Sequence, residues 1–103
     1  MKRSLRAEAP APLRTSVLQK LILFHPRDNV GVAVQDITKG EVLLVGKKLI
    51  TARDAIMRGH KIAVKDIPRG ANIIKLGLKI GKAKRRIRTG EHVHIHNVKS
   101  LYA

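Results

Sequence analysis

The clearest regularity in the chain is an alternation of apolar and polar residues that occurs twice, 30 positions apart. Residues 32–41 are VAVQDITKGE, and residues 62–71 are IAVKDIPRGA. A fainter copy, RIRTGE, occupies residues 86–91. The two full copies begin with β-branched residues that alternate as on a half-buried strand, and then contain Asp and Gly, which favour turns. The pattern therefore predicts short strands, each followed by a tight turn.

Further strands are predicted around these turns. Segments 21–24, 30–34, 42–45, 73–75 and 92–98 are short and rich in Val, Ile and Leu. Short strands at close spacing with glycine turns favour a mainly all-β fold, and the repeat predicts two hairpin-like halves related by a pseudo-twofold axis. One segment, residues 50–58, fits a short helix with Thr51 as its N-cap and Gly59 as its stop.

The residues of the predicted turns have specific expected roles. Asp36 and Asp66 are expected to accept hydrogen bonds from backbone amides, and the glycines that follow, Gly40, Gly70 and Gly90, are expected to supply φ > 0.

Residues 1–16 hold Arg and Pro without sustained periodicity, so we predict a flexible basic extension. Residues 17–103 are then a single domain, as expected for a chain of 103 residues.

Composition narrows the classes of function. The chain has 22 Lys and Arg against 7 Asp and Glu, a formal charge of +15, and no cysteine. The absence of thiols excludes a disulfide scaffold, a cysteine-based zinc finger and a cysteine nucleophile. No apolar run is long enough for a signal peptide or a membrane span, so we expect a cytoplasmic protein that does not bind membranes.

The positive charge is densest in residues 75–88, which hold seven Lys or Arg and no acidic residue. Such a run has the composition of a phosphate-contacting patch. However, Phe24 and Tyr102 are the only aromatic residues, so the stacking platforms of single-strand binders are missing, and no helix-turn-helix pattern is present. Charge alone supports only a non-specific, non-catalytic binder of nucleic acid or another polyanion.

The segment richest in candidate chemistry is 90–98, GEHVHIHNV, in which histidines alternate with apolar residues. On a strand this alternation puts His92, His94 and His96 on one face. Imidazoles at that spacing can bind one transition metal or act as acids and bases near neutral pH. A solvated polar strand face explains the spacing equally well, because the sequence places no carboxylate as a further ligand.

Two other histidines lie in turn-like segments. His25 and Asp28 belong to a polar loop, HPRDNV, in which ordinary turn chemistry is the favoured interpretation. His60 and Lys61 follow Gly59 directly before a predicted strand, where the pair can face an anion or simply begin a solvated strand.

Taken in order, these segments resemble a known family. The motifs HPxDNVxVA (25–33), GHKIA (59–63), IKxG with IGxA (74–83) and GEHVHxHN (90–97) occur in the order and spacing of the SAF domain of the altronate/galactarate dehydratase family. The resemblance covers about residues 20–98 and implies a β-clip fold, in agreement with the strand repeat. In the family this domain either begins a long dehydratase chain or forms a separate small subunit, and a chain of this length resembles the small subunit.

The resemblance also implies a function. It indicates a hydro-lyase or sulfo-lyase acting on a sugar acid or another 2-hydroxy carboxylate, inactive alone and completed by a large subunit. It implies a divalent metal, often iron(II), shared with or held by that large subunit. As catalytic residues it suggests His92, His94, His25, Asp28 and His60; as substrate-binding residues Lys61, Lys75 and Asn97; and as metal ligands His92, His94 and His96. A homo-oligomer is compatible with this assignment.

The chain departs from the family pattern at three positions. Leu76 stands in place of a common tyrosine, Gly31 in place of a small apolar residue, and Ile95 in place of a frequent threonine. The loss of the tyrosine weakens any inference about substrate contacts near Lys75. The positive surface is interpreted as favouring an acidic large subunit and carboxylate substrates. Nucleic-acid binding is the second hypothesis, and a structural β-clip adaptor is the third.

Overall fold

The computed structural model describes residues 20–101, which form nine short strands in three antiparallel sheets. The strands are β1 (Leu21–Ile22), β2 (Val30–Ala33), β3 (Val42–Val45), β4 (Lys48–Thr51), β5 (Lys61–Ala63), β6 (Asn72–Lys75), β7 (Leu78–Ala83), β8 (His92–Val93) and β9 (Val98–Ser100). The predicted all-β fold is confirmed. The extension predicted for residues 1–16 lies outside the described residues.

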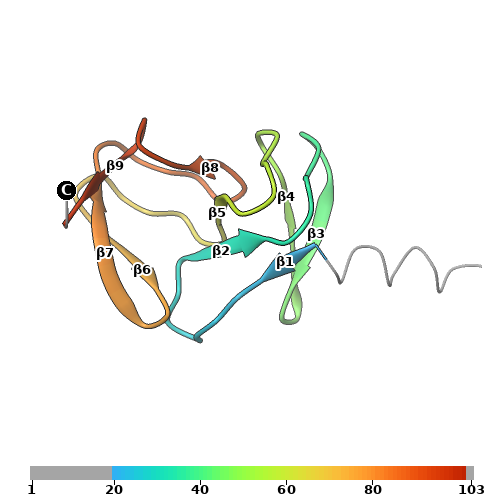
Figure 1. Cartoon of the computed structure of the whole chain (residues 1–103), viewed down its shortest axis with the longest axis horizontal. Helices are drawn as coiled ribbons and strands as arrows, with labels where there is room; N and C mark the ends of the chain where they lie inside the picture. The colour runs from blue at the N-terminus through green and yellow to red at the C-terminus, as the bar shows by residue number, and fades with distance from the viewer. Residues whose placement is uncertain (1–19, 102–103) are drawn as a thin grey trace, which may run out of the picture.

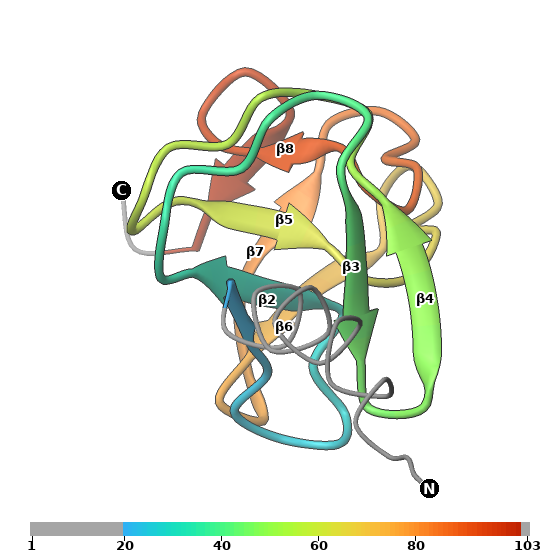
Figure 2. The same ribbon diagram turned by 90° about the vertical axis from the view of Figure 1, so that its right-hand side faces the viewer.

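The four-stranded sheet, in the order β1-β2-β5-β8, lies between the two smaller sheets, β3-β4 and β6-β7-β9 (Figure 1). Figure 2 shows β2 and β5 side by side at its centre, with the β3–β4 hairpin to one side. No helix among the described residues is long and apolar enough to cross a membrane.

The predicted two-unit repeat is present as two hairpins with the same surroundings. The β3–β4 hairpin is flanked by a backbone bridge between Ile37 and Ile56, and the β6–β7 hairpin by a bridge between Ile67 and Ile87. In each bridge both amides donate to the opposite carbonyl, at 2.8 and 2.9 Å in the first and 2.7 and 2.8 Å in the second. The backbone hydrogen bonds next to the first bridge recur next to the second. The repeat in sequence is therefore also a repeat in backbone pairing.

The predicted helix at residues 50–58 is wrong. Ile50 and Thr51 belong to β4, the Ala52 amide donates to the Glu41 carbonyl, and Ile56 exchanges bonds with Ile37. These cross-strand bonds use the backbone groups that a helix would need internally. The segment is another copy of the turn unit, because Ile-x-x-Gly occurs at residues 37–40, 56–59, 67–70 and 87–90.

The glycine predictions for the turns are confirmed, most clearly at Gly90. Gly40, Gly70 and Gly90 have φ of 90°, 82° and 94°. At Gly90 a Cβ atom would also collide with the carbonyl oxygen of Thr51, whereas nothing lies within 4 Å of a Cβ at Gly70. Gly90 therefore lets the last turn, which leads into β8, pack against the end of β4.

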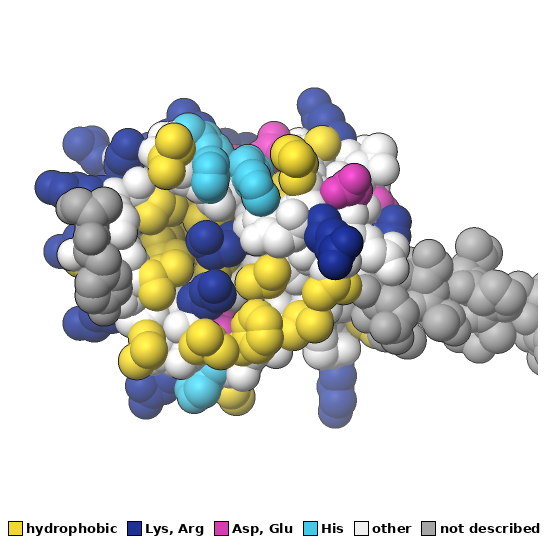
Figure 3. Space-filling model, in the orientation of Figure 1, with side chains coloured by type: hydrophobic (Ala, Val, Ile, Leu, Met, Phe, Trp, Pro, Cys, Tyr) yellow, Lys and Arg dark blue, Asp and Glu magenta, His cyan; other side chains and the backbone are white. Residues whose placement is uncertain are grey.

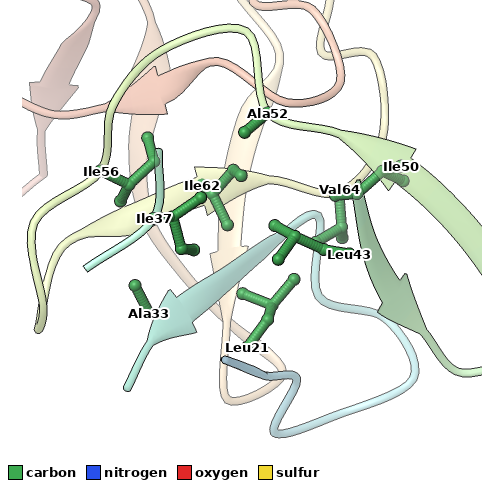
Figure 4. Close-up of a cluster of buried hydrophobic side chains, with 9 residues drawn as sticks. All are labelled: Leu21, Ala33, Ile37, Leu43, Ile50, Ala52, Ile56, Ile62 and Val64. Atoms are coloured by element: carbon green, nitrogen blue, oxygen red, sulfur yellow. The ribbon is translucent and has the colours of Figure 1, made fainter. Parts of the chain in front are cut away.

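Two apolar clusters hold the halves together. The first gathers side chains from β1 to β5 and the turns between them, which point toward one another in Figure 4: Leu21, Ala33, Ile37, Leu43, Ile50, Ala52, Ile56, Ile62 and Val64. The second gathers side chains from β2, β5, β6, β7 and β8 and from two turns: Val30, Ala63, Ile67, Ile73, Ala83, Ile87 and Val93. Ile62 of β5 belongs to the first cluster and its neighbour Ala63 to the second, so this strand joins the two cores.

Candidate active site

Four of the five histidines form a continuous group of ring contacts. His60 stacks on His92 and His94 with ring centroids 5.1 and 4.9 Å apart. His92 contacts His94 and His96, each at 5.4 Å. The Nδ1 atom of His60 lies 2.9 Å from Nε2 of His92, a hydrogen bond in which only one of the two nitrogens carries the proton. Figure 3 shows histidine side chains grouped near the top of the face it presents.

Strand pairing and one turn bring these rings together. In the β5–β8 ladder Ile62 pairs with His92, so His60 approaches His92 although they are 32 residues apart. After Val93 the chain turns, and the predicted strand over 92–98 is interrupted by a turn at residues 94–97. Same-face residues of a strand would stand about 6.6 Å apart, so the turn brings the rings closer than a strand would.

Two side chains fix this turn. Asn97 is fully buried; its Oδ1 accepts the His94 amide at 2.9 Å, and its Nδ2 donates to the His92 carbonyl at 2.8 Å. The Asp54 carboxylate accepts the His92 amide at 2.9 Å. Asn97, predicted to bind substrate, has both ends of its amide occupied by the backbone that carries the histidines. Asp54 was missed because its segment was assigned to a helix.

Burial is the main influence on the pKa of His92. Burial, followed by the nearby His60, His96 and His94 charges, lowers the pKa of His92, and the Asp54 carboxylate opposes this shift. The neutral form of His92 is therefore favoured near neutral pH. Neutral imidazole is also the form that binds metals.

The structure selects a different trio of candidate metal ligands from the predicted one. His60, His92 and His94 each offer a ring nitrogen, and these three atoms lie within 4.8 Å of one another. This group contains His60 where the prediction had His96. Only the β5–β8 pairing shows that His60 lies close to His92. Three neutral imidazoles are a donor set that suits zinc, iron, copper or nickel and leaves further coordination positions open, so the residues fit a divalent transition metal.

His25 and Asp28 lie at another place, beside the β6–β7 turn. The buried Asp28 carboxylate accepts the amides of Leu76 and Gly77 at 3.0 and 2.9 Å. The His25 ring lies so close to Gly77 that a Cβ there would be 3.1 Å from it. Asp28 therefore stabilises a hairpin turn in which Leu76 has φ of 55°. The structure brings neither residue into the cluster of four histidines.

Two cavities open beside the cluster. One, of about 280 Å³, is lined by Lys61, Ile80, His94, Ile95, Val98 and Ser100. The other, of about 500 Å³, is lined by Asp54, Arg85, Arg86, Glu91, His92 and His96. In the first, burial and then the charge of Lys75 lower the pKa of Lys61. The structure thus places the predicted residue Lys61 on the wall of the first cavity, which Lys75 does not line, while the acidic residues Asp54 and Glu91 of the second cavity were not predicted.

Comparison with known proteins finds one family over all the described residues. Residues 19–101 match the model of the altronate/galactarate dehydratase SAF domain. The chain is 46% identical to an altronate dehydratase of Escherichia coli over 79 residues and 43% identical to one of Bacillus subtilis over 83 residues. These matches cover 77% and 81% of this chain but only 16% and 17% of the dehydratases.

A third relative is of similar size to this chain. The chain is 38% identical over 86 residues to the (2R)-sulfolactate sulfo-lyase subunit alpha of Chromohalobacter salexigens, a match that covers 77% of this chain and 92% of that subunit.

Proposed function

Because this chain belongs to the family of the altronate/galactarate dehydratase SAF domain, we propose that it is the small subunit of a cytoplasmic hydro-lyase or sulfo-lyase acting on a 2-hydroxy carboxylate. The observation that carries the proposal is the His60–His92–His94 group, in which residues from two separated motifs meet. The relative named subunit alpha, which the chain covers almost entirely, supports a role as one chain of an assembly.

In the proposed reaction a base supplied by a second chain takes the proton next to the carboxylate, the electron pair of that C–H bond forms a double bond, and the β-hydroxyl leaves as water or the β-sulfonate as sulfite. His60, His92 and His94 would hold a divalent metal. When bound, such an ion supplies Lewis-acid stabilisation of the charge that develops on the substrate oxygens. His96 touches His92 but is outside the three-nitrogen group, so we assign to its exposed ring the exchange of a proton with the leaving group.

A second chain is part of the proposal because this cluster is open. His94 and His96 are exposed at the surface of the part of the chain that the structure describes. Lyases of this type need water excluded and further groups around the substrate. We propose that a large subunit supplies both.

Two measurements test the proposal. Calorimetric titration of the isolated chain with Zn²⁺, a redox-inert probe, should show one site whose affinity falls by about 100-fold or more in a His92→Gln/His94→Gln variant. His25→Gln, which removes an imidazole outside the cluster, is the matched control and should bind as the wild type does.

The second measurement is turnover after co-expression with large dehydratase-type subunits from the same genome. Activity should require both chains and should be lost in the double variant while its circular dichroism spectrum is unchanged. Absence of a complex with every such subunit, or unchanged turnover in the variant, would refute the proposed function.

One observation favours a second candidate, a non-catalytic polyanion binder. On one face of the β6-β7-β9 sheet Lys82 pairs directly with Lys99, and Lys79 follows along β7, all three exposed. Like charges opposite each other destabilise a sheet, so a bound polyanion would relieve them. Steep loss of duplex DNA binding between about 50 and 200 mM salt would support this candidate, and absence of binding at the lower salt would exclude it.

A further inference from the structure

Exposed apolar side chains gather where the segment after β1 meets the turn between β6 and β7. Leu23 and Phe24 are 36% and 48% exposed, and Leu76 and Leu78 are 54% and 64% exposed. These four side chains form an apolar patch. Figure 3 shows hydrophobic side chains over β1 and the end of this hairpin, on the same face as the group of histidines. Single exposed apolar residues are common, but a group of them on one face is typical of a surface that binds another protein.

Packing and hydrogen bonds join the two segments that carry the patch. The His25 ring lies against Gly77, where a Cβ would be 3.1 Å from it. The buried Asp28 carboxylate accepts the amides of both turn residues, Leu76 and Gly77, at 3.0 and 2.9 Å. The patch is therefore presented from a fixed backbone, which reduces the conformational entropy lost when a partner binds.

The internal repeat shows that leucine is an unusual choice at position 76. The equivalent residue of the β3–β4 hairpin, 30 positions earlier, is Gly46, which also comes directly after the first strand of its hairpin. Both residues have positive φ, 61° at Gly46 and 55° at Leu76. Glycine adopts this conformation without steric cost, whereas the Cβ of leucine strains it. Because the Leu76 side chain is more than half exposed, little packing within the chain offsets this strain. Contact with another chain explains why leucine occupies the turn.

We propose that the apolar patch docks on the large subunit of the lyase, with Leu76 and Phe24 inserted into an apolar depression of that subunit. This inference rests on the proposed function for the existence of the large subunit. The patch and the open histidine cluster share one face, so a single partner can cover both. In the two altronate dehydratases the matched region is only 16% and 17% of the chain, so the equivalent domain there is joined to a much larger polypeptide.

Charge favours this partner over a second copy of the chain. Arg27, Lys75 and Lys79 flank the patch in the sequence, and the whole chain has a formal charge of +15. Two copies packed through the patch would bring these cations together, which costs free energy at an interface. An apolar depression bordered by carboxylates avoids that repulsion and attracts the same cations. The large subunit is therefore expected to present such a surface.

The test measures the dissociation constant between this chain and the large dehydratase-type subunits encoded in the same genome. Leu76→Asn and Phe24→Asn, measured separately, should each raise Kd by about tenfold or more, the effect of truncating an anchor residue. Leu76→Asn relieves backbone strain, so a more stable chain that binds more weakly excludes misfolding as the cause. Leu49→Asn makes the same change at a 64% exposed position of β4, in the other hairpin. It is the matched control and should change Kd by less than about twofold.

Complex formation and turnover separate this inference from the proposed function. A complex weakened by both patch variants but inactive on 2-hydroxy carboxylates leaves the docking surface standing and refutes the lyase. Turnover with Kd unchanged in both patch variants, or raised equally in Leu49→Asn, overturns the docking surface and leaves the lyase standing. Absence of a complex with every such large subunit overturns both. Sedimentation should show a monomer for the isolated chain, and a dimer that Leu76→Asn dissociates would overturn the proposal, because a second copy would then occupy the patch.

Discussion

Asn97 connects the stability of the fold to the geometry of the histidine cluster, so its replacement by Ala is a demanding test. The Asn97 side chain makes two hydrogen bonds. Its Oδ1 accepts from the His94 backbone amide at 2.9 Å, and its Nδ2 donates to the His92 carbonyl at 2.8 Å. The variant leaves both backbone groups without these partners in a partly buried turn. Each unsatisfied group costs about 1–3 kcal/mol, and allowing for partial access of water we expect a loss of about 2–4 kcal/mol.

The same change should also affect metal binding. Without Asn97 the turn at residues 94–97 loses the side chain that joins His94 to His92, and the three ring nitrogens no longer have a fixed separation. We expect Zn²⁺ affinity to fall by about 10- to 100-fold, as when a residue that orients a metal ligand is lost. Urea unfolding followed by circular dichroism gives the free energy of unfolding, and calorimetry gives the affinity.

Asn29→Ala is the matched control. Asn29 also bonds two backbone groups, the Asn72 carbonyl at 2.9 Å and the Ile74 amide at 2.8 Å, but on β6. It should therefore lose comparable stability and keep the Zn²⁺ affinity of the wild type. A loss of less than about 0.5 kcal/mol in Asn97→Ala, or an equal fall of metal affinity in both variants, would refute the reasoning.

Three further predictions concern turns. Gly90→Ala should lower the free energy of unfolding by at least about 2 kcal/mol more than Gly70→Ala, since both have positive φ but only Gly90 faces the Thr51 carbonyl; equal losses in urea unfolding would contradict this. Leu76→Asn should raise the free energy of unfolding by about 0.5–1 kcal/mol, because Asn tolerates the left-handed φ of 55° better than Leu; a destabilised variant would show that the exposed Leu side chain contributes more than the strain costs. Hydrogen bonds from the Thr89 backbone amide, and next from the Thr89 hydroxyl, lower the pKa of Asp66 below its usual value of 3.8. The charged Asp66 carboxylate therefore stabilises the fold at pH values above 3.8, and this stabilisation is lost as the pH falls through the lowered pKa. Asp66→Asn should therefore be less stable than wild type at pH 7 and approach it in acid below that range, and a difference that does not change with pH would contradict the assignment.

Local pattern was enough to predict most of the fold. The repeat around Ile37 and Ile67 predicted the strands and positive-φ glycines because alternation and turn chemistry act over a few residues. The helix prediction at residues 50–58 failed because the partners of this segment, Glu41 and Ile37, lie across a sheet and are not marked by local propensity. The spacing from Ile56 to Gly59, shared with the other turns, was the signal that identifies it.

The site was harder to predict for the same reason. The alternation of His92, His94 and His96 suggested that all three face together, and the rings do form a group. However, the hydrogen-bonded partner of the His92 ring is His60, which the β5–β8 ladder brings from 32 residues away. The roles of Asn97 and Asp54 depend on backbone groups that become available only when the turns have formed. No spacing in the sequence specifies such bonds.

The chain has 22 Lys and Arg against 7 Asp and Glu, and most of its few carboxylates have a structural role. Of the six acidic residues in the described part, five accept backbone amides: Asp28, Asp36, Glu41, Asp54 and Asp66. These carboxylates therefore stabilise turns, although Asp54 and Glu91 also line the larger cavity and Asp66 pairs with Arg86. A site built by this chain alone supplies imidazoles and cations but few carboxylates. Under the proposed function, further acidic groups would have to come from the second subunit, whose surface would then be attracted to this one.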